Sequence, residues 1–345
     1  MTDSASNAAD VDPDLVTMID AVFANYRESH PPTGSIARDA ELWLSLDQLG
    51  LLRLSGSERS GGSGADWYES AALITAAVRH GVRIPLAEHD MLACWLLEAV
   101  GAPIDQAART VCVLDTAGNA TAVPWASTAE RIVVVWPDGQ RYLMTDADCT
   151  DLRIVPGTNL IGEPRDSVSA DIGSLTGTAV SAELVEQLRL KSALVRSIQV
   201  CAALDSILEL TVDYASSRVQ FGRPLSKFQA IQHLISDIAT EAALARAATE
   251  AALAAAVESD WSAAKLGFFV AVARSCAGHA ASVAVRNGHQ ALGAIGTTIE
   301  HRLHEYTRAA LAWRSEFGSV RHWDEEVTRA ALGAGSAGLW GLIAD

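Results

Sequence analysis

The stretch from Tyr214 to His233 reads Tyr-Ala-Ser-Ser-Arg-Val-Gln-Phe-Gly-Arg-Pro-Leu-Ser-Lys-Phe-Gln-Ala-Ile-Gln-His. The protein carries a formal net charge of −16, yet no acidic residue lies between positions 214 and 236. Arg218, Arg223 and Lys227 stand there beside two phenylalanines and three glutamines. A basic, amide-rich and aromatic segment in an acidic protein predicts a site for an anionic ligand that carries a ring.

The same stretch predicts a break between two helices. Gly222 and Pro224 are typical of a helix end, and a new helix is expected to begin near Ser226. Backbone N–H groups at a helix N-terminus favour a negative charge. The predicted break therefore strengthens the expectation of an anionic ligand.

Composition excludes several classes of function. The acidic charge balance disfavours binding to nucleic acid or to an anionic membrane surface. The five cysteines are scattered and form no CxxC pair, which indicates reduced thiols in a cytoplasmic protein. The longest apolar run, residues 266–285, is interrupted by an arginine and a histidine, so no membrane span is expected. His301, His304 and Arg308 share helical spacing, but no carboxylate or cysteine converges on them, and no metal site is expected.

The periodicity of apolar residues divides the chain into three parts. Residues 1–101 have helical spacing after a loose polar tail at 1–12. Residues 102–180 contain short β-branched runs between turn residues and predict a small antiparallel sheet domain. Residues 181–345 return to helical spacing and predict a four-helix bundle. The expected fold is mostly α with a small β domain.

The helices of the last part are expected to pack closely. Alanine-rich runs such as 242–256 have high helix propensity and leave little side chain between neighbouring helices. After the first helix of this part, further helices are predicted over residues 226–258, 261–288 and 300–316.

Three segments, in this order, resemble the flavin-dependent acyl-CoA dehydrogenase family. Trp43-Leu-Ser-Leu-Asp-Gln-Leu-Gly-Leu-Leu, followed by Glu58 and Gly61-Gly-Ser-Gly, resembles its N-terminal helix and glycine loop. Arg218-Val-Gln-Phe-Gly-Arg-Pro-Leu resembles its signature, and Gln290-Ala-Leu-Gly-Ala-Ile-Gly resembles its late glycine turn. The resemblance implies a helix–sheet–helix architecture, the order already inferred from the periodicity.

The resemblance also implies a site for FAD. It makes Arg218 the ligand of the FAD pyrophosphate, Gln220 an amide partner and Phe221 a packing wall, on a flavin held mainly by a neighbouring subunit. The residues that it implies for the adenosine half are Gln229, Gln290, Gly293 and Gly296. Glycines suit such a turn because backbone N–H groups can approach phosphate closely. The alternative for Arg218 is a surface salt bridge.

Dehydrogenation of an acyl-CoA thioester needs a carboxylate base for the α-proton while a hydride leaves the β-carbon for the flavin N5 atom. The resemblance implies two places for this base. One, 26 residues before Arg218, holds Ser192 in this chain. The other is a Glu-Gly-Thr-like segment after the glycine turn, where Glu316 is the candidate. The alternative for Glu316 is an exposed helix-end residue paired with Arg314 or Arg321.

The middle part departs from the family. The Thr-Glu-Pro and Trp-Ile-Thr motifs that flank the flavin ring in family members are missing, and the short middle domain resembles that of small bacterial members. Several of those are halves of heteromeric enzymes that degrade sterol side chains.

Three hypotheses follow: an acyl-CoA dehydrogenase with Glu316 as base, a partner subunit without its own base, and a flavin-free helical scaffold. The resemblance further implies an acyl-CoA substrate and an electron-transfer flavoprotein as acceptor. It implies assembly as a dimer or tetramer, with a second dehydrogenase-like chain in a heterotetramer or with further copies of this one.

Overall fold

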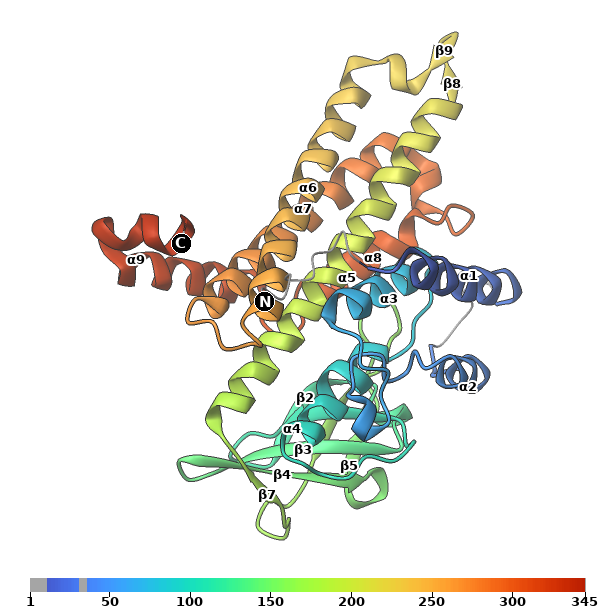
Figure 1. Ribbon diagram of the computed structural model, residues 1–345. Helices are drawn as coiled ribbons and strands as arrows, with labels where there is room; N and C mark the ends of the chain where they lie inside the picture. The colour runs from blue at the N-terminus through green and yellow to red at the C-terminus, as the bar shows by residue number, and fades with distance from the viewer. Residues whose placement is uncertain (1–10, 31–35, 345) are drawn as a thin grey trace. The chain divides into compact units, whose positions relative to one another are not determined.

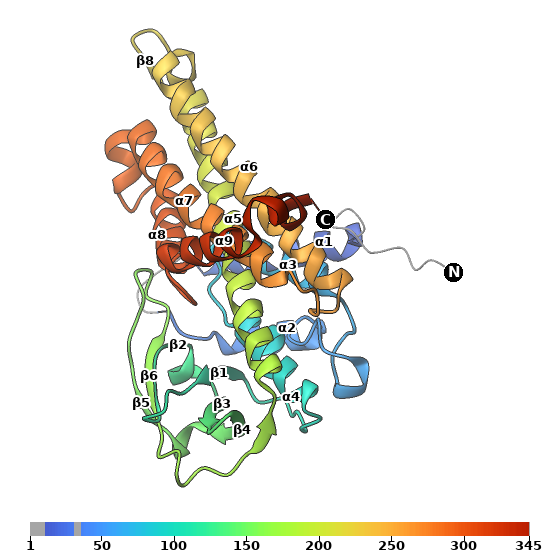
Figure 2. The same cartoon turned by 90° about the vertical axis from the view of Figure 1, so that its left-hand side faces the viewer.

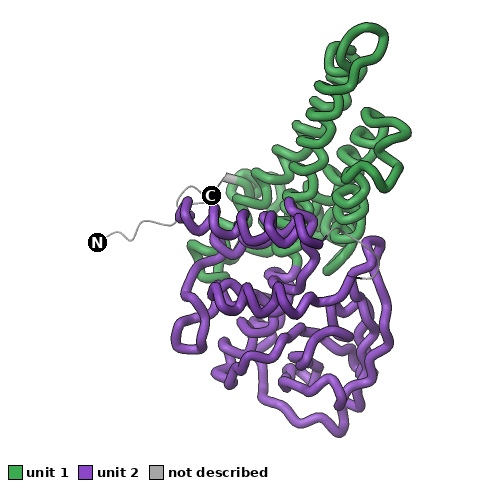
Figure 3. Tube along the Cα trace, turned by 90° about the vertical axis from the view of Figure 1, so that its right-hand side faces the viewer, with its two compact units in different colours: residues 1–10, 193–345 green, residues 11–192 purple. Residues whose placement is uncertain are grey.

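The computed structural model describes residues 11–30 and 36–344. Residues 1–10 of the loose tail predicted at 1–12 lie outside the described residues. Figure 1 shows that helices dominate and that the strands between residues 109 and 180 form one small β region. The mostly α fold with a small β domain is therefore confirmed. The chain divides into two compact units, Val11–Ser192 and the chain from Ala193 onward (Figure 3). The three-part division at residues 101 and 180 stays a prediction.

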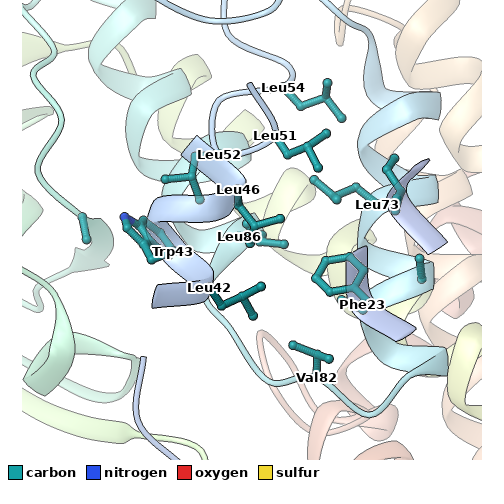
Figure 4. Packing of buried hydrophobic residues seen from close by; sticks show 14 residues of the cluster. Phe23, Leu42, Trp43, Leu46, Leu51, Leu52, Leu54, Leu73, Val82 and Leu86 are labelled. Carbon is teal, nitrogen blue, oxygen red and sulfur yellow. The ribbon is translucent and has the colours of Figure 1, made fainter. Parts of the chain in front are cut away.

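Helices open the first unit. They are α1 (Pro13–Ser29), α2 (Ala40–Gln48), the 3-10 helix η2 (Glu58–Ser60), α3 (Trp67–Arg79), the π-helix η3 (Ala87–Cys94) and α4 (Trp95–Ala99). An aspartate side chain caps the N-termini of α1, α2 and α3, where it accepts a backbone N–H bond that the helix leaves free. Phe23, Trp43 and Leu46 belong to the buried cluster that holds these helices together (Figure 4).

Two small sheets follow in the same unit. The strands are β1 (Arg109–Val113), β2 (Asn119–Pro124), β3 (Arg131–Asp138), β4 (Arg141–Asp148), β5 (Arg153–Val155), β6 (Arg165–Ser169) and β7 (Thr178–Val180), with 3-10 turns η4 (Ala126–Thr128) and η5 (Cys149–Asp151). The sheet orders are β1-β3-β4-β7 and β2-β6-β5. The prediction of antiparallel strands is wrong for β1 and β3, which pair in parallel. The reason is that β2 leaves for the other sheet, so β3 returns beside β1 in the same direction.

The second unit is built from long helices. Helix α5 (Ala182–Ser217) begins in the first unit and continues into the second. It is followed by β8 (Val219–Gln220), β9 (Arg223–Pro224), the 3-10 turn η6 (Leu225–Lys227), α6 (Gln229–Glu258), α7 (Leu266–Leu292), the 3-10 turn η7 (Gly293–Thr297), α8 (Leu303–Trp313) and α9 (Val320–Ala344). Helices α5 to α8 are the four that the sequence predicts, and α9 was not predicted.

Helix α7 is the core helix of the second unit. It packs along α6 and also contacts α8 and α9, and half of the residues it buries are alanines. Small side chains allow this close approach of helices. By length and composition, the segment Leu266–Thr297 is also apolar enough to cross a membrane, and half of its most apolar window is buried. Burial of that kind is what a core helix shows.

Two glycines of α7, Gly267 and Gly278, allow the effect of helix packing on stability to be measured separately from the effect of helix propensity. A Cβ atom at Gly278 would lie 2.6 Å from Val320 Cγ2, whereas one at Gly267 would meet nothing within 4 Å. We expect Gly278→Ala to lower the free energy of unfolding by about 1–3 kcal/mol through overpacking. Gly267→Ala should leave it unchanged or raise it by up to about 1 kcal/mol. Chemical denaturation of both variants measures the difference; equal effects would contradict this packing.

Candidate functional site

A tight hairpin joins α5 to α6. Strands β8 and β9 pair antiparallel with Gln220 opposite Arg223, which leaves Phe221 and Gly222 as a two-residue turn. Both turn residues have positive φ, 51° at Phe221 and 79° at Gly222, as in the turns that suit such hairpins. Glycine adopts this conformation freely, but a bulky residue such as phenylalanine does so at a cost of order 1–3 kcal/mol. The hairpin therefore holds an aromatic side chain in a strained position.

The hairpin exposes apolar and charged groups together. Phe221 is 90% exposed and Val219 is 57% exposed. The rings of Phe221 and Phe228 meet edge to face at 6.1 Å, and the Arg223 guanidinium lies 4.2 Å from the Phe228 ring centroid. Such a cation–π pair orders the base of the turn. An ordered, exposed aromatic beside cations indicates a surface that another molecule covers.

The structure places four of the predicted site residues at this tip. Arg218 and Gln220 are exposed in the hairpin with Phe221, and Gln229 is exposed at the first turn of α6. The side chain of Arg218 has no ion-pair partner among the described residues. A salt bridge within the described chain therefore does not explain this arginine.

The other three predicted residues lie at the end of α7. Gln290 and Gly293 are exposed, and Gly293 has φ +65° with open space where a side chain would point. Gly296 is buried, and a Cβ there would lie 2.9 Å from Leu292 Cβ and 3.1 Å from Leu303 Cδ2. Packing alone thus accounts for glycine at 296. Figures 1 and 2 show the hairpin at the free end of the α5–α6 pair, beyond the end of α7.

Histidines surround this end of α7. His289 Nε2 lies 3.1 Å from Thr307 Oγ1, and burial lowers the pKa of His289. The rings of Tyr214 and His301 meet edge to face at 5.9 Å, which ties the end of α5 to the segment before α8. Across residues 11–30 and 36–344, no group of three or more His, Cys, Asp and Glu side chains is arranged to hold a metal ion. The histidines here pack and hydrogen-bond.

The predicted base, Glu316, lies in the turn that follows α8. Its Oε2 atom accepts a hydrogen bond of 2.7 Å from Nε of Arg196, a residue of α5 that is fully buried. A second guanidinium nitrogen of Arg196 donates to Gln199 Oε1 at 2.7 Å, and the Arg196 guanidinium lies 5.0 Å from the Phe317 ring centroid. Glu316 is thus held against the core by an arginine, and its partner is neither Arg314 nor Arg321.

A second buried arginine closes the same turn. One nitrogen of the Arg274 guanidinium, from α7, donates to the carbonyl oxygens of Arg314 at 3.0 Å and Glu316 at 2.7 Å. Burial and the nearby charge of Arg196 lower the pKa of Arg274 to about 9. These carbonyls are left free where a helix ends, and Arg274 satisfies them. The sequence predicts a helix that ends at residue 316, but α8 ends at Trp313. The cap by Arg274 explains this earlier end.

Residues 181–332 match the family model described as acyl-CoA dehydrogenase, C-terminal domain. That range contains the hairpin, the end of α7 and the Glu316 turn. Acyl-CoA dehydrogenase FadE34 of Mycobacterium tuberculosis is 27% identical over 328 residues, which cover 88% of this chain and 45% of FadE34. The chain therefore spans less than half of the length of that relative.

Solved structures share the fold over nearly the whole chain. The ChsE4–ChsE5 complex from Mycobacterium tuberculosis contains a chain with a TM-score of 0.80 and 20% identity, over 96% of this chain and 98% of that one. A variant of the Tcur3481–Tcur3483 steroid ACAD also has a TM-score of 0.80 and 20% identity, over 94% of this chain and 99% of that one.

Residues 181–332 therefore carry the C-terminal domain of the acyl-CoA dehydrogenases, which confirms the resemblance that the sequence indicates. The relatives of the chain include proteins named acyl-CoA dehydrogenase, and butyryl-CoA dehydrogenase of Megasphaera elsdenii shares its fold, which supports the enzyme class that the sequence indicates.

The two buried arginines, Arg196 and Arg274, are the site residues that sequence reasoning missed. In the sequence, Arg274 stands out only as an interruption of the apolar run 266–285, and Arg196 belongs to no motif. The signal was present, since each is a cation inside a helix whose neighbours in sequence are mostly apolar. Buried charges need a partner. The position 26 residues before Arg218 holds Ser192, whose hydroxyl donates to the Leu188 carbonyl at 2.7 Å.

The strain at Phe221 provides a test of the hairpin. We expect Phe221→Gly to raise the free energy of unfolding or leave it unchanged, because glycine removes the cost of positive φ. The same variant should also weaken the binding of any molecule that contacts the exposed Phe221 ring. Phe221→Asn, which tolerates this conformation, is the matched control for loss of the ring. Thermal denaturation and flavin content measure the two effects; a Phe221→Gly protein that is less stable by more than about 1 kcal/mol would contradict the strain.

Proposed function

We propose that this chain takes part in FAD-dependent α,β-dehydrogenation of an acyl-CoA thioester as one subunit of a larger assembly. The observation that supports this most is the hairpin at the end of α5 and α6. Its cation Arg218, its ring Phe221 and the neighbouring glutamines are all exposed. They project outward, which suits a flavin held mainly by another chain.

The residues present fit FAD. Arg218 would bind the pyrophosphate, because an unpaired guanidinium forms charge-assisted hydrogen bonds to phosphate oxygens. Gln220 and Gln229 would donate amide hydrogens, and Phe221 would pack on the cofactor. Gln290 and Gly293, both exposed at the end of α7, would meet the adenosine half. When bound, FAD would accept the hydride that leaves the acyl chain.

Two proposals are possible for the carboxylate that acts as the base. Either Glu316 removes the α-proton in this chain, or another chain supplies the carboxylate. A general base must accept a proton readily, and an opposite charge beside a carboxylate favours its ionised form and weakens it as a proton acceptor. Glu316 has such a charge at 2.7 Å, the buried Arg196. This ion pair favours the second proposal, and we adopt it.

A heteromeric assembly follows from that choice. A homo-oligomer whose only candidate base is paired with Arg196 would lack a base, so a second dehydrogenase-type chain must provide one. The likeness to a chain of the ChsE4–ChsE5 complex supports this proposal. We propose a bulky acyl-CoA of steroid type as substrate, since a similar chain comes from a steroid ACAD. We further propose a cytoplasmic heterotetramer, with an electron-transfer flavoprotein as acceptor.

Removal of the Arg218 charge tests the flavin site. In protein co-expressed with a second acyl-CoA dehydrogenase-type chain, we expect Arg218→Ala to weaken FAD retention by about tenfold or more, because a hydrogen bond to a charged group is lost. Flavin absorbance per mole of purified assembly measures this.

The matched control is Arg321→Ala, which removes an exposed arginine of α9 that is paired with Glu325. Both variants should keep the wild-type unfolding temperature. Flavin content that stays unchanged in Arg218→Ala would overturn the assignment of the hairpin to FAD.

A further inference from the structure

The last part of α9 differs from the rest of this acidic chain because it carries no charge. The first half of the helix is charged and makes ion pairs, such as that of Arg329 with Glu326. From residue 330 to residue 344 there is no Asp, Glu, Lys, Arg or His, although the whole chain has a net charge of −16. Two copies of a strongly acidic protein repel each other, and an uncharged face is where they can meet without that cost.

A glycine bend sets the direction of this uncharged segment. Gly335 has φ +61° and ψ −179°, a backbone conformation that is essentially restricted to glycine. Beyond the bend, Gly338, Gly341 and Leu342 are partly buried. Lys265, which precedes α7, donates through Nζ to the carbonyl oxygen of Gly341. The bend and this hydrogen bond hold the end of α9 beside the turn between α6 and α7, where it projects to the left of these helices in Figure 1.

The opposite face of the segment exposes large apolar side chains. Leu339, Trp340 and Ile343 stand at positions i, i+1 and i+4, which fall within one stripe of a helix. All three are exposed, Trp340 by 75%, and Leu332, before the bend, is 77% exposed. Single exposed apolar residues are ordinary, but a group of this kind marks a surface that another molecule covers.

The exposed glycine beside Leu332 has no explanation within the described chain. A Cβ atom at Gly333 would meet nothing within 4 Å among the described residues, and Gly333 lacks the positive φ that favours glycine. Glycine inside a helix costs roughly 0.5–1 kcal/mol relative to alanine. Small residues let a second helix approach closely, and such a contact would offset this cost.

The segment supplies both halves of a helix–helix contact. Gly333 leaves room for a neighbouring helix, and Leu332 and Trp340 are apolar side chains that can fill such room. In a two-fold contact the same surface meets itself, so a residue of one copy packs on a different residue of the other, and the reverse contact forms as well. An uncharged surface that matches itself, on a strongly acidic chain, fits a second copy of that chain.

A lipid surface fits this segment less well. Helices that lie on membranes combine an apolar face with a strongly charged face that is rich in lysine and arginine. The segment 330–344 has no charged residue of either sign. It is also shorter than the about 20 apolar residues that a membrane-spanning helix needs.

We propose that two copies of this chain associate through residues 330–344 at the ends of their α9 helices. The contact is two-fold, buries Leu332, Trp340 and Ile343 of each copy, and brings Gly333 close to the other helix. It deepens the proposed heterotetramer, which contains two copies of this chain, but it needs neither the flavin nor the second kind of chain. The hairpin and the end of α9 are separate elements, so either assignment can fail alone.

Sedimentation equilibrium of the full-length chain, expressed alone, tests the contact. At micromolar concentration we expect twice the 36.4 kDa mass of one chain. Leu332→Glu and Trp340→Glu place charges in the contact, and each should weaken association by about tenfold or more, because apolar burial is lost and like charges meet. The matched control is Ile299→Glu, which changes an 87% exposed isoleucine outside α9 and should leave association unchanged. A monomeric wild-type chain, or equal weakening in the control, would overturn the proposal.

Gly333→Ala separates the contact from the stability of a single copy. The added methyl group has open space within one copy and raises helix propensity, so the unfolding temperature of the monomer should stay or rise. The same methyl group obstructs a closely packed second helix, so association should weaken by about tenfold. Association that is unchanged or tighter in Gly333→Ala would contradict the close helix contact.

Two further measurements distinguish the other occupants. Flotation with vesicles of phosphatidylcholine and phosphatidylglycerol should leave the wild-type chain in solution, and flotation that Trp340→Glu abolishes would assign the segment to a lipid surface. Co-purification with a second acyl-CoA dehydrogenase-type chain should survive Trp340→Glu, and its loss would assign the segment to that chain. Either of these results overturns the contact between copies, whereas unchanged flavin content in Arg218→Ala leaves it intact.

Discussion

The ion pair between Arg196 and Glu316 is the interaction on which the C-terminal unit's site depends. Arg196 is fully buried, so its charge needs a carboxylate, and Glu316 is the one that meets it. Removing one partner of a buried ion pair typically costs about 3–5 kcal/mol. Arg274 adds to the constraint, because its guanidinium holds the carbonyl oxygen of Glu316 and so fixes the backbone that carries the side chain. The turn after α8 is therefore built around two buried cations.

This constraint separates two tasks that could have belonged to one chain. The hairpin is exposed, strained and basic, features that suit contact with a ligand and a partner. The Glu316 turn is partly buried and its carboxylate is paired with Arg196, which suits structural support. A chain with an intact hairpin and an engaged glutamate fits a subunit that completes a flavin site while another subunit supplies the base. The family supports a role in acyl-CoA dehydrogenation, and the ion pair shapes our proposal for the division of labour.

The sequence predicted the fold well where periodicity is local. Helical spacing and alanine-rich runs predicted α5 to α8, and β-branched runs predicted the strands. It could not predict that β1 pairs with β3 in parallel, because that depends on β2 joining a different sheet. It also predicted an ordinary helix where η3 widens to a π-helix around Glu88, His89 and Asp90, since tertiary contacts with the loop decide that geometry.

The sequence predicts those site residues that belong to a motif. It does not predict those whose role depends on a partner far away in the sequence. The Arg218 segment could be recognised from composition, but the φ of Phe221 is a property of the folded hairpin. The bond from Arg196 to Glu316 joins residues 120 positions apart and has no local signal. Gly296 was assigned to the cofactor, whereas the structure also explains it by packing against Leu303.

The most direct test of this account is the rate at which an acyl-CoA substrate bleaches the flavin of the assembled enzyme when Glu316 is changed to Gln. Glutamine keeps an oxygen for Arg196 but cannot act as a base. We predict that the Glu316→Gln assembly retains its flavin and bleaches at close to the wild-type rate. A loss of about a hundredfold or more, with flavin still bound and the fold intact, would show that Glu316 is the base and would contradict the account.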